Sequence, residues 1–257
     1  GLDLQLDYNI LSPKKAGDLG IAVGLVANYN VNEIIQLPDS ADGELIGTGR
    51  EGGPLREYFT LRYAGVNPAN GELLYYTADG NVTESPNADT DRVWLDKNII
   101  PDWEGGFTLN VDYKGFYLTT QWNYRTGVDR FDGQYGSYVA PDNVGSFNVS
   151  NDILRAWTQP GDITDIPANN ASNRNSFASD RFLRSADFLR LRFASVGYRF
   201  SQDVLDKIGF SNLTLFFNAE NALTFTEWRG FDPETRSNNR NTYPTPQTFS
   251  VGLELGF

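Results

Sequence analysis

Apolar and polar residues alternate along seven stretches of this chain. In the last stretch the residues of one parity are small or polar. Those of the other parity are Phe249, Val251, Leu253, Leu255 and Phe257. Because successive side chains of a strand point to opposite faces, a period of two predicts a β-strand with one apolar face.

Six further stretches show the same period. Five are regular, and their apolar positions run from Leu2 to Ile10, Leu19 to Val31, Phe107 to Tyr113, Phe116 to Tyr124 and Leu213 to Ala219. The sixth changes parity, because Leu189, Leu191 and Phe193 share one parity whereas the apolar residues from 196 to 200 share the other. We expect a β-bulge near Ala194 and Ser195, since one extra residue would return both halves to one face.

Strand length and the polar face favour a membrane barrel. The runs are about 10 to 13 residues long, whereas ordinary strands have about 5 or 6 residues and membrane-spanning ones about 9 to 11. Charged groups recur on the polar face and need water, which a wide lumen supplies. The lumen-facing residues expected here include Asp3, Asp7, Asp112, Arg125, Arg190, Arg192, Glu220 and Glu254.

The connections alternate in length. Short ones are expected at 12–18, at 114–115 and at 201–211, where Val204, Leu205 and Ile208 predict a short helix ended by Gly209. Long ones are expected at about 32–103, 128–187 and 226–245. Short periplasmic turns and long extracellular loops are typical of outer-membrane barrels. The chain is therefore predicted to be all-β, a transmembrane antiparallel β-barrel.

The loop pattern also orients the strands. With short turns on the periplasmic side, aromatic residues fall near two rims. The inner set is Tyr8, Tyr113, Phe116, Tyr198 and Phe257, and the outer set is Tyr29 and Tyr124. Seven strands are an odd number that leaves two open edges, so we expect further strands, either upstream in a longer parent chain or in a partner chain. The absence of Met at position 1 leads to the same expectation of a preceding segment.

Composition excludes several classes of function. The net charge of -12 argues against nucleic-acid binding. The absence of Cys and His removes thiolate nucleophiles, Ser-His-Asp triads and imidazole metal ligands. The acidic group Asp89, Asp91 and Asp96 lacks the spacing of a Ca²⁺ loop. No catalytic residue, cofactor or metal is expected, and the chain is not predicted to be an enzyme.

Several ordered motifs resemble one family. They are ADFLRLRFASVGY (186–198), FNAENALTF (217–225), GFDPE (230–234), YPTPQTFSVGL (243–253), YAGVNPANG (63–71) and ILRAWT (153–158). These stretches resemble the SusC/RagA-type TonB-dependent transporters. The resemblance implies that residues 1–257 form the C-terminal part, about seven strands, of a 22-stranded barrel whose plug domain and earlier strands are absent. It also implies import of oligosaccharides or peptides, with TonB and a SusD-like lipoprotein as partners.

Candidate functional residues follow from these patterns. The alternating residues Phe249 to Phe257 resemble the signal read by the barrel-assembly machinery. Loop side chains that are candidates for substrate binding are Trp94, Trp157, Trp228, Arg229 and Tyr243, although packing within the loops is the favoured alternative for the aromatic ones. Arg190 and Arg192 either line the substrate path or pair with Glu220, Glu254 or plug residues.

Three functions are compatible with the sequence. The leading hypothesis is import in the outer membrane of a Gram-negative bacterium, with outer-membrane lipid around the barrel and either glycans or peptides as substrate. The second is a scaffold barrel of a surface complex that does not transport. The third is a secreted carbohydrate-binding β-sandwich, which would need two packed sheets in place of one curved sheet.

Overall fold

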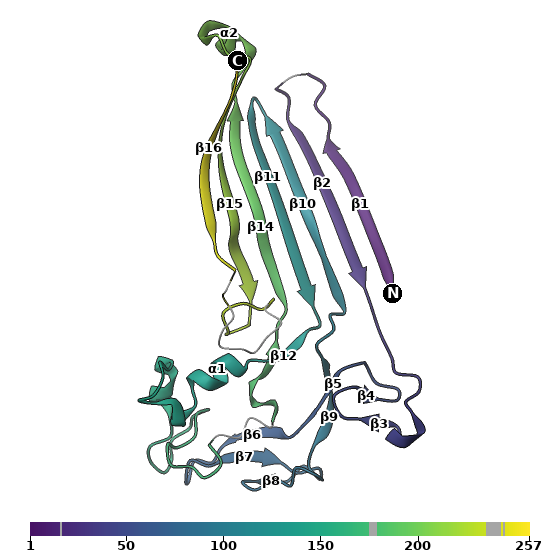
Figure 1. The fold of residues 1–257 in the computed structure, drawn as a ribbon, viewed down its shortest axis with the longest axis vertical. Coiled ribbons are helices and arrows are strands. Elements are labelled where there is room, and N and C mark those ends of the chain that lie inside the picture. The colour runs from purple at the N-terminus through teal and green to yellow at the C-terminus, as the bar shows by residue number, and fades with distance from the viewer. Residues whose placement is uncertain (16, 175–178, 235–242, 244) are drawn as a thin grey trace.

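The largest element is one antiparallel sheet of seven long strands (Figure 1). The computed structural model describes residues 1–15, 17–174, 179–234, 243 and 245–257. The long strands are β1 (Leu2–Leu11), β2 (Gly20–Tyr29), β10 (Trp103–Tyr113), β11 (Phe116–Thr126), β14 (Phe188–Arg199), β15 (Asn212–Thr226) and β16 (Thr248–Gly256). They lie side by side in sequence order, which confirms all seven predicted strands.

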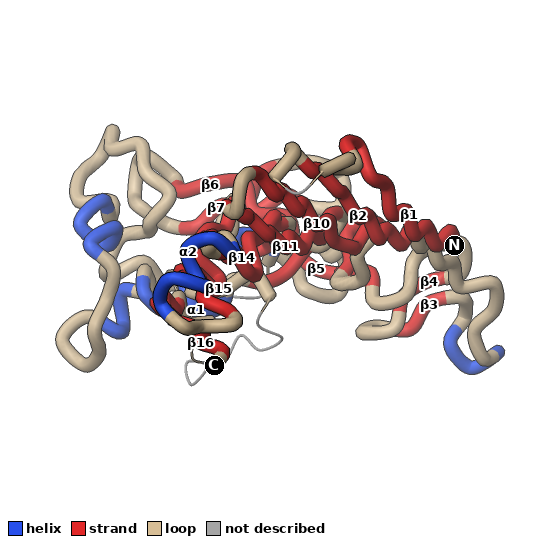
Figure 2. The backbone as a smooth tube through the Cα atoms, turned by 90° about the horizontal axis from the view of Figure 1, so that it is seen from above, coloured by secondary structure: helices blue, strands red, loops and turns tan. Residues whose placement is uncertain are grey.

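The register puts most of the apolar residues of the seven strands on one face. One row across the sheet runs through Leu6, Leu25, Phe107 and Trp122. Figure 2 shows these strands as a single row. In the described part of the chain, the smaller sheets lie beyond the ends of the long strands rather than against a face of the row (Figure 1). The β-sandwich hypothesis is therefore wrong, and the fold is all-β with one continuous antiparallel sheet.

The short connections all lie at one end of the sheet (Figure 1). Lys114 and Gly115 form a two-residue turn with φ angles of +49° and +89°, a left-handed conformation that suits a tight hairpin and favours glycine. The predicted helix is α2 (Gln202–Ile208), and Gly209 ends it with φ +77°. The expected alternation of short and long connections is thus confirmed.

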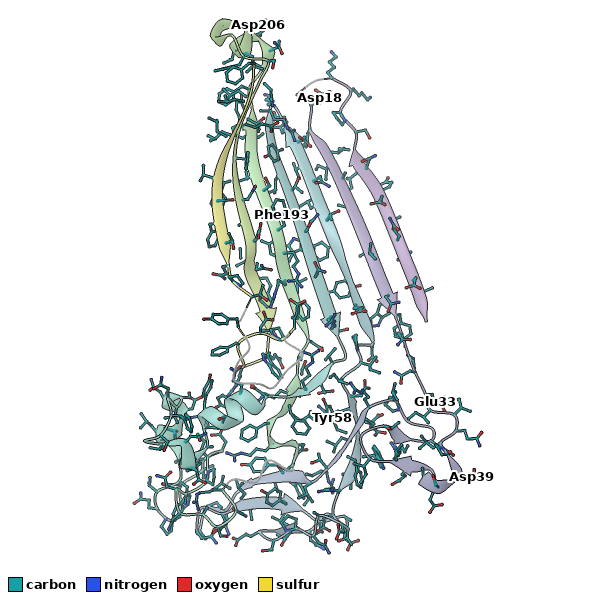
Figure 3. All side chains as sticks on the ribbon, viewed as in Figure 1. Asp18, Glu33, Asp39, Tyr58, Phe193 and Asp206 are labelled. Atoms are coloured by element: carbon teal, nitrogen blue, oxygen red, sulfur yellow. The ribbon has the colours of Figure 1, made fainter. Side chains whose placement is uncertain are left out.

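The predicted bulge exists, but its expected position was wrong. Trp122 of β11 pairs with Leu191 and Gln121 pairs with Phe193, so Arg192 is the extra residue on β14. Ala194 and the apolar residues after it then return to the apolar face. Phe193, in the middle of the sheet in Figure 3, lies on the polar face. An apolar side chain on the polar face made the parity change appear two residues too late.

Aromatic residues gather near both ends of the strands, as expected. At the end with the short turns, the rings of Phe116 and Tyr198 lie 4.6 Å apart between their centroids. At the other end, the rings of Tyr29 and Trp103 also lie 4.6 Å apart. Amphipathic rings suit the two interfaces of a membrane, so these two bands agree with a membrane-spanning sheet.

The long connections run over 30–102, 127–187 and 227–247 and gather beyond the other end of the sheet (Figure 1). Within these loops, residues 175–178, 235–242 and 244 lie outside the described part of the chain. Short elements that the alternation did not predict fill the first two loops. They are β3 (Glu44–Leu45), β4 (Gly49–Arg50), β5 (Glu57–Thr60), β6 (Arg62–Val66), β7 (Leu73–Tyr76), β8 (Val82–Thr83), β9 (Val93–Asn98), β12 (Asp129–Phe131), α1 (Gly133–Tyr138), β13 (Leu183–Ser185) and 3₁₀ turns at Asp39–Ala41, Pro141–Asn143, Asn151–Arg155 and Asp180–Phe182.

The buried apolar clusters lie in these loops rather than in the sheet. One cluster consists of Leu61, Val66, Leu73 and Tyr75. The other consists of Tyr135, Val139, Ile166 and Phe182. Trp157 of the second long loop packs against the first cluster, so the first two long loops form one folded layer beyond the ends of the strands.

Candidate functional site

The polar face of the sheet carries every charged side chain of the seven strands. Alternation puts them there, because their neighbours in sequence occupy the apolar face. The strands contain no lysine; their arginines are Arg125, Arg190, Arg192 and Arg199. Their carboxylates are Asp3, Asp7, Glu104, Asp112, Glu220 and Glu254.

Arg190 and Arg192 bind the loop that follows β15. The Arg190 guanidinium, 3% exposed, donates hydrogen bonds to both carboxylate oxygens of Asp232 at 2.7 and 3.2 Å. It also lies 2.6 Å from a carboxylate oxygen of Glu234. Arg192 donates to the other oxygen of Glu234. We call Arg190, Arg192, Asp232 and Glu234 the latch, since they fix residues 232–234 to β14.

The chemistry of the latch depends on burial and on ion pairing together. Burial alone would raise the pKa of the Asp232 carboxyl, but hydrogen bonds from Arg190 and Thr245 lower that pKa to about 2. The carboxylate is therefore ionised at neutral pH and compensates the buried guanidinium. The partners named from the sequence, Glu220 and Glu254, were wrong, because both arginines pair with carboxylates of the loop.

The same loop has a second anchor on the preceding loop. The Arg229 guanidinium lies over the ring of Tyr135 in α1, 5.6 Å from its centroid. Phe231 and Tyr138 pack edge to face at 6.1 Å. The backbone N–H of Gly230 hydrogen-bonds the buried carboxylate of Asp132. Residues 229–234 thus connect α1 on one side with the polar face of β14 on the other.

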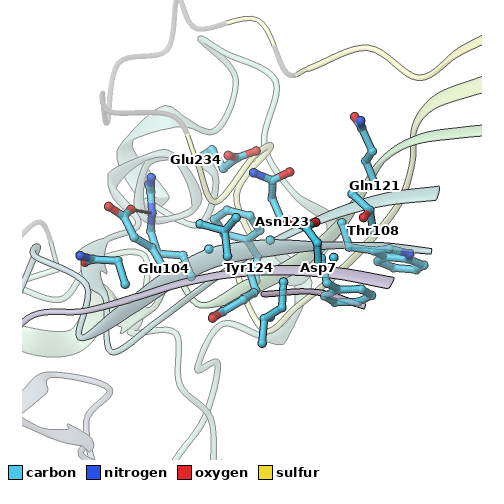
Figure 4. Close-up of a pocket in the computed structure, with 17 residues that line it drawn as sticks. Asp7, Glu104, Thr108, Gln121, Asn123, Tyr124 and Glu234 are labelled. Carbon is cyan, nitrogen blue, oxygen red and sulfur yellow. Dashed lines mark hydrogen bonds and ion pairs between the residues drawn. The ribbon is translucent and has the colours of Figure 1, made fainter. Parts of the chain in front are cut away.

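A pocket of about 560 Å³ opens on the polar face beside the latch (Figure 4). Its polar lining comes from four neighbouring strands and one latch residue, namely Asp7, Asn28, Glu104, Thr108, Gln121, Asn123, Arg125 and Glu234. Arg125 and Glu104 form an ion pair at 3.1 Å. Gly24 lines the pocket without a side chain, and a Cβ at this position would lie 2.7 Å from the Thr108 hydroxyl. The glycine therefore keeps this part of the pocket open. The remaining amides and hydroxyls can bind polar groups by hydrogen bonds.

The aromatic candidates for substrate binding lie in different surroundings, and two of them pack within the loops. Trp94 packs against Phe59 between β5 and β9, with ring centroids 4.8 Å apart. Trp157 packs against the cluster around Leu73 and donates its indole N–H to the Pro68 carbonyl at 3.0 Å. These two side chains hold the loops together.

Trp228, Arg229 and Tyr243 belong to the loop that carries the latch. Trp228 is half-buried beside Gly230, where a Cβ would lie 2.5 Å from the indole nitrogen. Tyr243 is 94% exposed. Trp228 and Arg229 are therefore the two candidates that lie next to the latch.

Two latch residues were missed by sequence reasoning. Asp232 and Glu234 lie within the GFDPE motif but were not assigned a role from the sequence. A usable signal was present, because Arg190 and Arg192 on the polar face require compensating anions. The pairs join residues 42 positions apart, which no local periodicity reveals.

The last strand keeps its apolar residues uncovered by the described part of the chain. Phe249, Val251 and Leu253 are 58%, 74% and 58% exposed. Phe257 is 91% exposed and packs edge to face on Phe210, with centroids 5.3 Å apart. These residues thus form a continuous outward stripe on β16.

Among the described residues, no group of three or more His, Cys, Asp or Glu side chains could hold a metal ion. No helix in the same residues is long and apolar enough to cross a membrane.

Comparison with known proteins gives a consistent family. No family model matches the chain. TonB-dependent receptor P39 of Formosa agariphila is 30% identical over 210 residues, which cover 77% of this chain and 20% of that protein. TonB-dependent receptor SusC of Bacteroides thetaiotaomicron is 30% identical over 201 residues, covering 76% and 19%. The chain therefore spans about a fifth of the length of these curated relatives.

The solved structures agree with these relatives. The RagAB peptide importer in its closed-closed state matches with a TM-score of 0.83 and 28% identity, covering 99% of this chain and 29% of that one. The open-open state matches with a TM-score of 0.81 and 27% identity. Since sequence, strand arrangement and loop pattern all agree, the chain belongs to the SusC/RagA-type TonB-dependent transporters and forms a segment of their β-barrel.

Proposed function

We propose that the protein of which this chain is a segment imports oligosaccharides or peptides across the outer membrane of a Gram-negative bacterium. The observation that carries this proposal is the two-faced sheet, whose outward face is mainly apolar and uncharged and whose inward face holds all the charged groups of the strands. Such a wall suits lipid on one side and a water-filled passage on the other. The relatives, named as receptors and a peptide importer, support the same activity.

The energy source and partners follow from the family. TonB supplies the energised step through a region upstream of this chain, and a SusD-like lipoprotein covers the extracellular side. The RagAB importer, to which the chain is similar, supports the lipoprotein partner. The barrel-assembly machinery reads the stripe from Phe249 to Phe257. No catalytic step, metal or cofactor is part of the proposal.

The polar face provides the candidate substrate path. Arg125, Glu220 and Glu254 lie along the passage, while Arg190 and Arg192 contribute through the latch. Trp228 and Arg229 are the first loop residues to test, since they lie beside the latch at the extracellular end. Tyr243 is exposed enough to reach a substrate, whereas Trp94 and Trp157 act mainly in packing.

Deletion of the parent gene tests import directly. Uptake of labelled neutral oligosaccharides and peptides is measured in wild-type, deleted and complemented cells, with a protonophore to remove the energy source. Loss of uptake on deletion and on protonophore treatment is expected for at least one substrate. Unchanged uptake across both panels would favour the scaffold role. Fractionation with outer membranes and altered gel mobility without boiling check the barrel itself.

A further inference from the structure

Every cation of the seven strands is already neutralised. Arg125 pairs with Glu104 at 3.1 Å, and Arg199 pairs with Asp112 at 2.6 Å. Arg190 and Arg192 are held by the two carboxylates of the latch. An anion that entered along this wall would find no guanidinium without first displacing a carboxylate, which would then lose its own partner.

Four carboxylates of the same face have no cation partner among the described residues. They are Asp3, Asp7, Glu220 and Glu254, and they lie on β1, β15 and β16 at both sides of the sheet. Asp3 accepts a hydrogen bond from the Asn28 amide at 2.6 Å, which satisfies the carboxylate without removing its charge. The described part of the wall thus carries more carboxylates than cations, and this excess opposes the approach of anions.

The pocket beside the latch combines uncharged polar groups, a paired arginine and a carboxylate without a cation partner among the described residues. Its uncharged polar groups include Asn28, Thr108, Gln121 and Asn123, which both donate and accept hydrogen bonds. Its one arginine is paired, and Asp7 adds an uncompensated carboxylate. A volume of about 560 Å³ falls within the range of sites that bind small ligands, about 300 to 1,000 Å³.

We propose that this pocket binds a substrate unit that is rich in hydroxyl or amide groups and carries no negative charge, and that the wall disfavours anionic oligomers. The inference rests on the proposed function and narrows its substrate class. Amide and hydroxyl side chains complement the groups of a neutral sugar or of a peptide backbone. Like charges placed together oppose binding, so uronate, sulfated and Asp-rich oligomers are poor substrates.

The test uses the full parent protein and pairs of oligomers equal in length that differ only in charge. Neutral, Lys-containing and Asp-containing peptides are compared, together with neutral and uronate oligosaccharides. Binding to the purified protein and uptake by cells are measured separately. We expect binding of the neutral or cationic member of a pair to exceed that of its anionic counterpart at least about tenfold.

Two matched variants locate the effect. Gln121→Lys adds a cation to the pocket, whereas Thr119→Lys adds it two residues away, on the same strand and the same face. Gln121→Lys is expected to raise anionic binding severalfold, and Thr119→Lys to change it much less. Gel mobility without boiling confirms that both variants fold.

The outcomes separate the two proposals. Equal binding of anionic and neutral members by the wild-type protein, binding of none of the oligomers, or equal effects of the two variants would each overturn the pocket assignment. Charge-selective binding without uptake by cells would contradict import while supporting the pocket. Charge-selective binding that Gln121→Lys alone relaxes supports both the site and its substrate class.

Discussion

The sheet and its loops bury apolar surface in opposite ways. In the loops, Leu73 and Tyr75 are 0% and 1% exposed within clusters that the chain supplies itself. In the sheet, Leu253 and Phe225 remain 58% and 57% exposed. The loops therefore bury their apolar side chains as a small soluble domain does. The apolar face of the sheet stays exposed, as expected of a face that contacts lipid. The latch is the place where these two regions are joined by charge.

The largest effect is expected from breaking that joint. Arg190→Ala leaves Asp232 buried without its guanidinium, and loss of one partner of a buried pair costs about 3–5 kcal/mol. Hydrogen exchange of residues 228–234 and urea unfolding of the parent protein measure the loss. Arg199→Ala is the control, since its pair with Asp112 is more than half exposed and is worth at most about 1 kcal/mol. Equal losses for the two variants would show that burial does not matter at the latch.

A core substitution distinguishes the two regions. Leu73→Ala leaves a cavity in the loop cluster and is expected to cost about 2–5 kcal/mol, seen as lost exchange protection over residues 61–75. Leu253→Ala removes a side chain that faces outward and is expected to cost much less. Equal destabilisation by Leu253→Ala and Leu73→Ala would contradict the conclusion that the loops bury their apolar side chains and the sheet does not.

A charge on the outward face provides the reverse test. Val251→Arg places a guanidinium on the lipid side of β16, which costs about 2–4 kcal/mol near the bilayer midplane. Ser250→Arg puts the same group on the polar face one residue away and is expected to be tolerated. The fraction of protein that shows shifted gel mobility without boiling reports assembly. Equal assembly of both variants would contradict the assignment of the faces.

The smallest effect concerns acid. The pKa of Asp232 in the folded state is about 2, below its ordinary value of 3.8. The carboxylate therefore stabilises the folded state above about pH 4, and this contribution is lost as pH falls from about 4 to 2. This contribution to the free energy of unfolding amounts to at most about 2 kcal/mol. Exchange protection of residues 228–234 across this range measures it, and Asp232→Asn should remove the dependence.

The sequence predicted the sheet better than the loops, because the two faces of a strand appear in the sequence as an alternation of apolar and polar residues. Alternation located all seven strands, and only Phe193 misled it, since an apolar residue on the polar face shifted the inferred bulge. The loops show no such alternation. Trp157 meets the cluster around Leu73 through contacts about 85 residues apart in the chain, so its packing role was visible only in three dimensions.

The candidate site shows the same division. The polar residues of the strands were placed on the correct face, because parity alone decides that. The latch was not foreseen, since it depends on how the loop after β15 folds back onto β14. Two arginines on the polar face need carboxylate partners, and this could be expected from the sequence. That the partners are Asp232 and Glu234 became visible only in the structure.

The latch also constrains the order in which this part of the barrel can form. Arg190 belongs to β14, whereas Asp232 lies between β15 and β16, so the pair joins three consecutive strands rather than one hairpin. The loop between β15 and β16 can therefore take its observed position on the polar face only when β14 lies beside β15. One arginine in a strand thus couples the placement of this loop to the pairing of the strands.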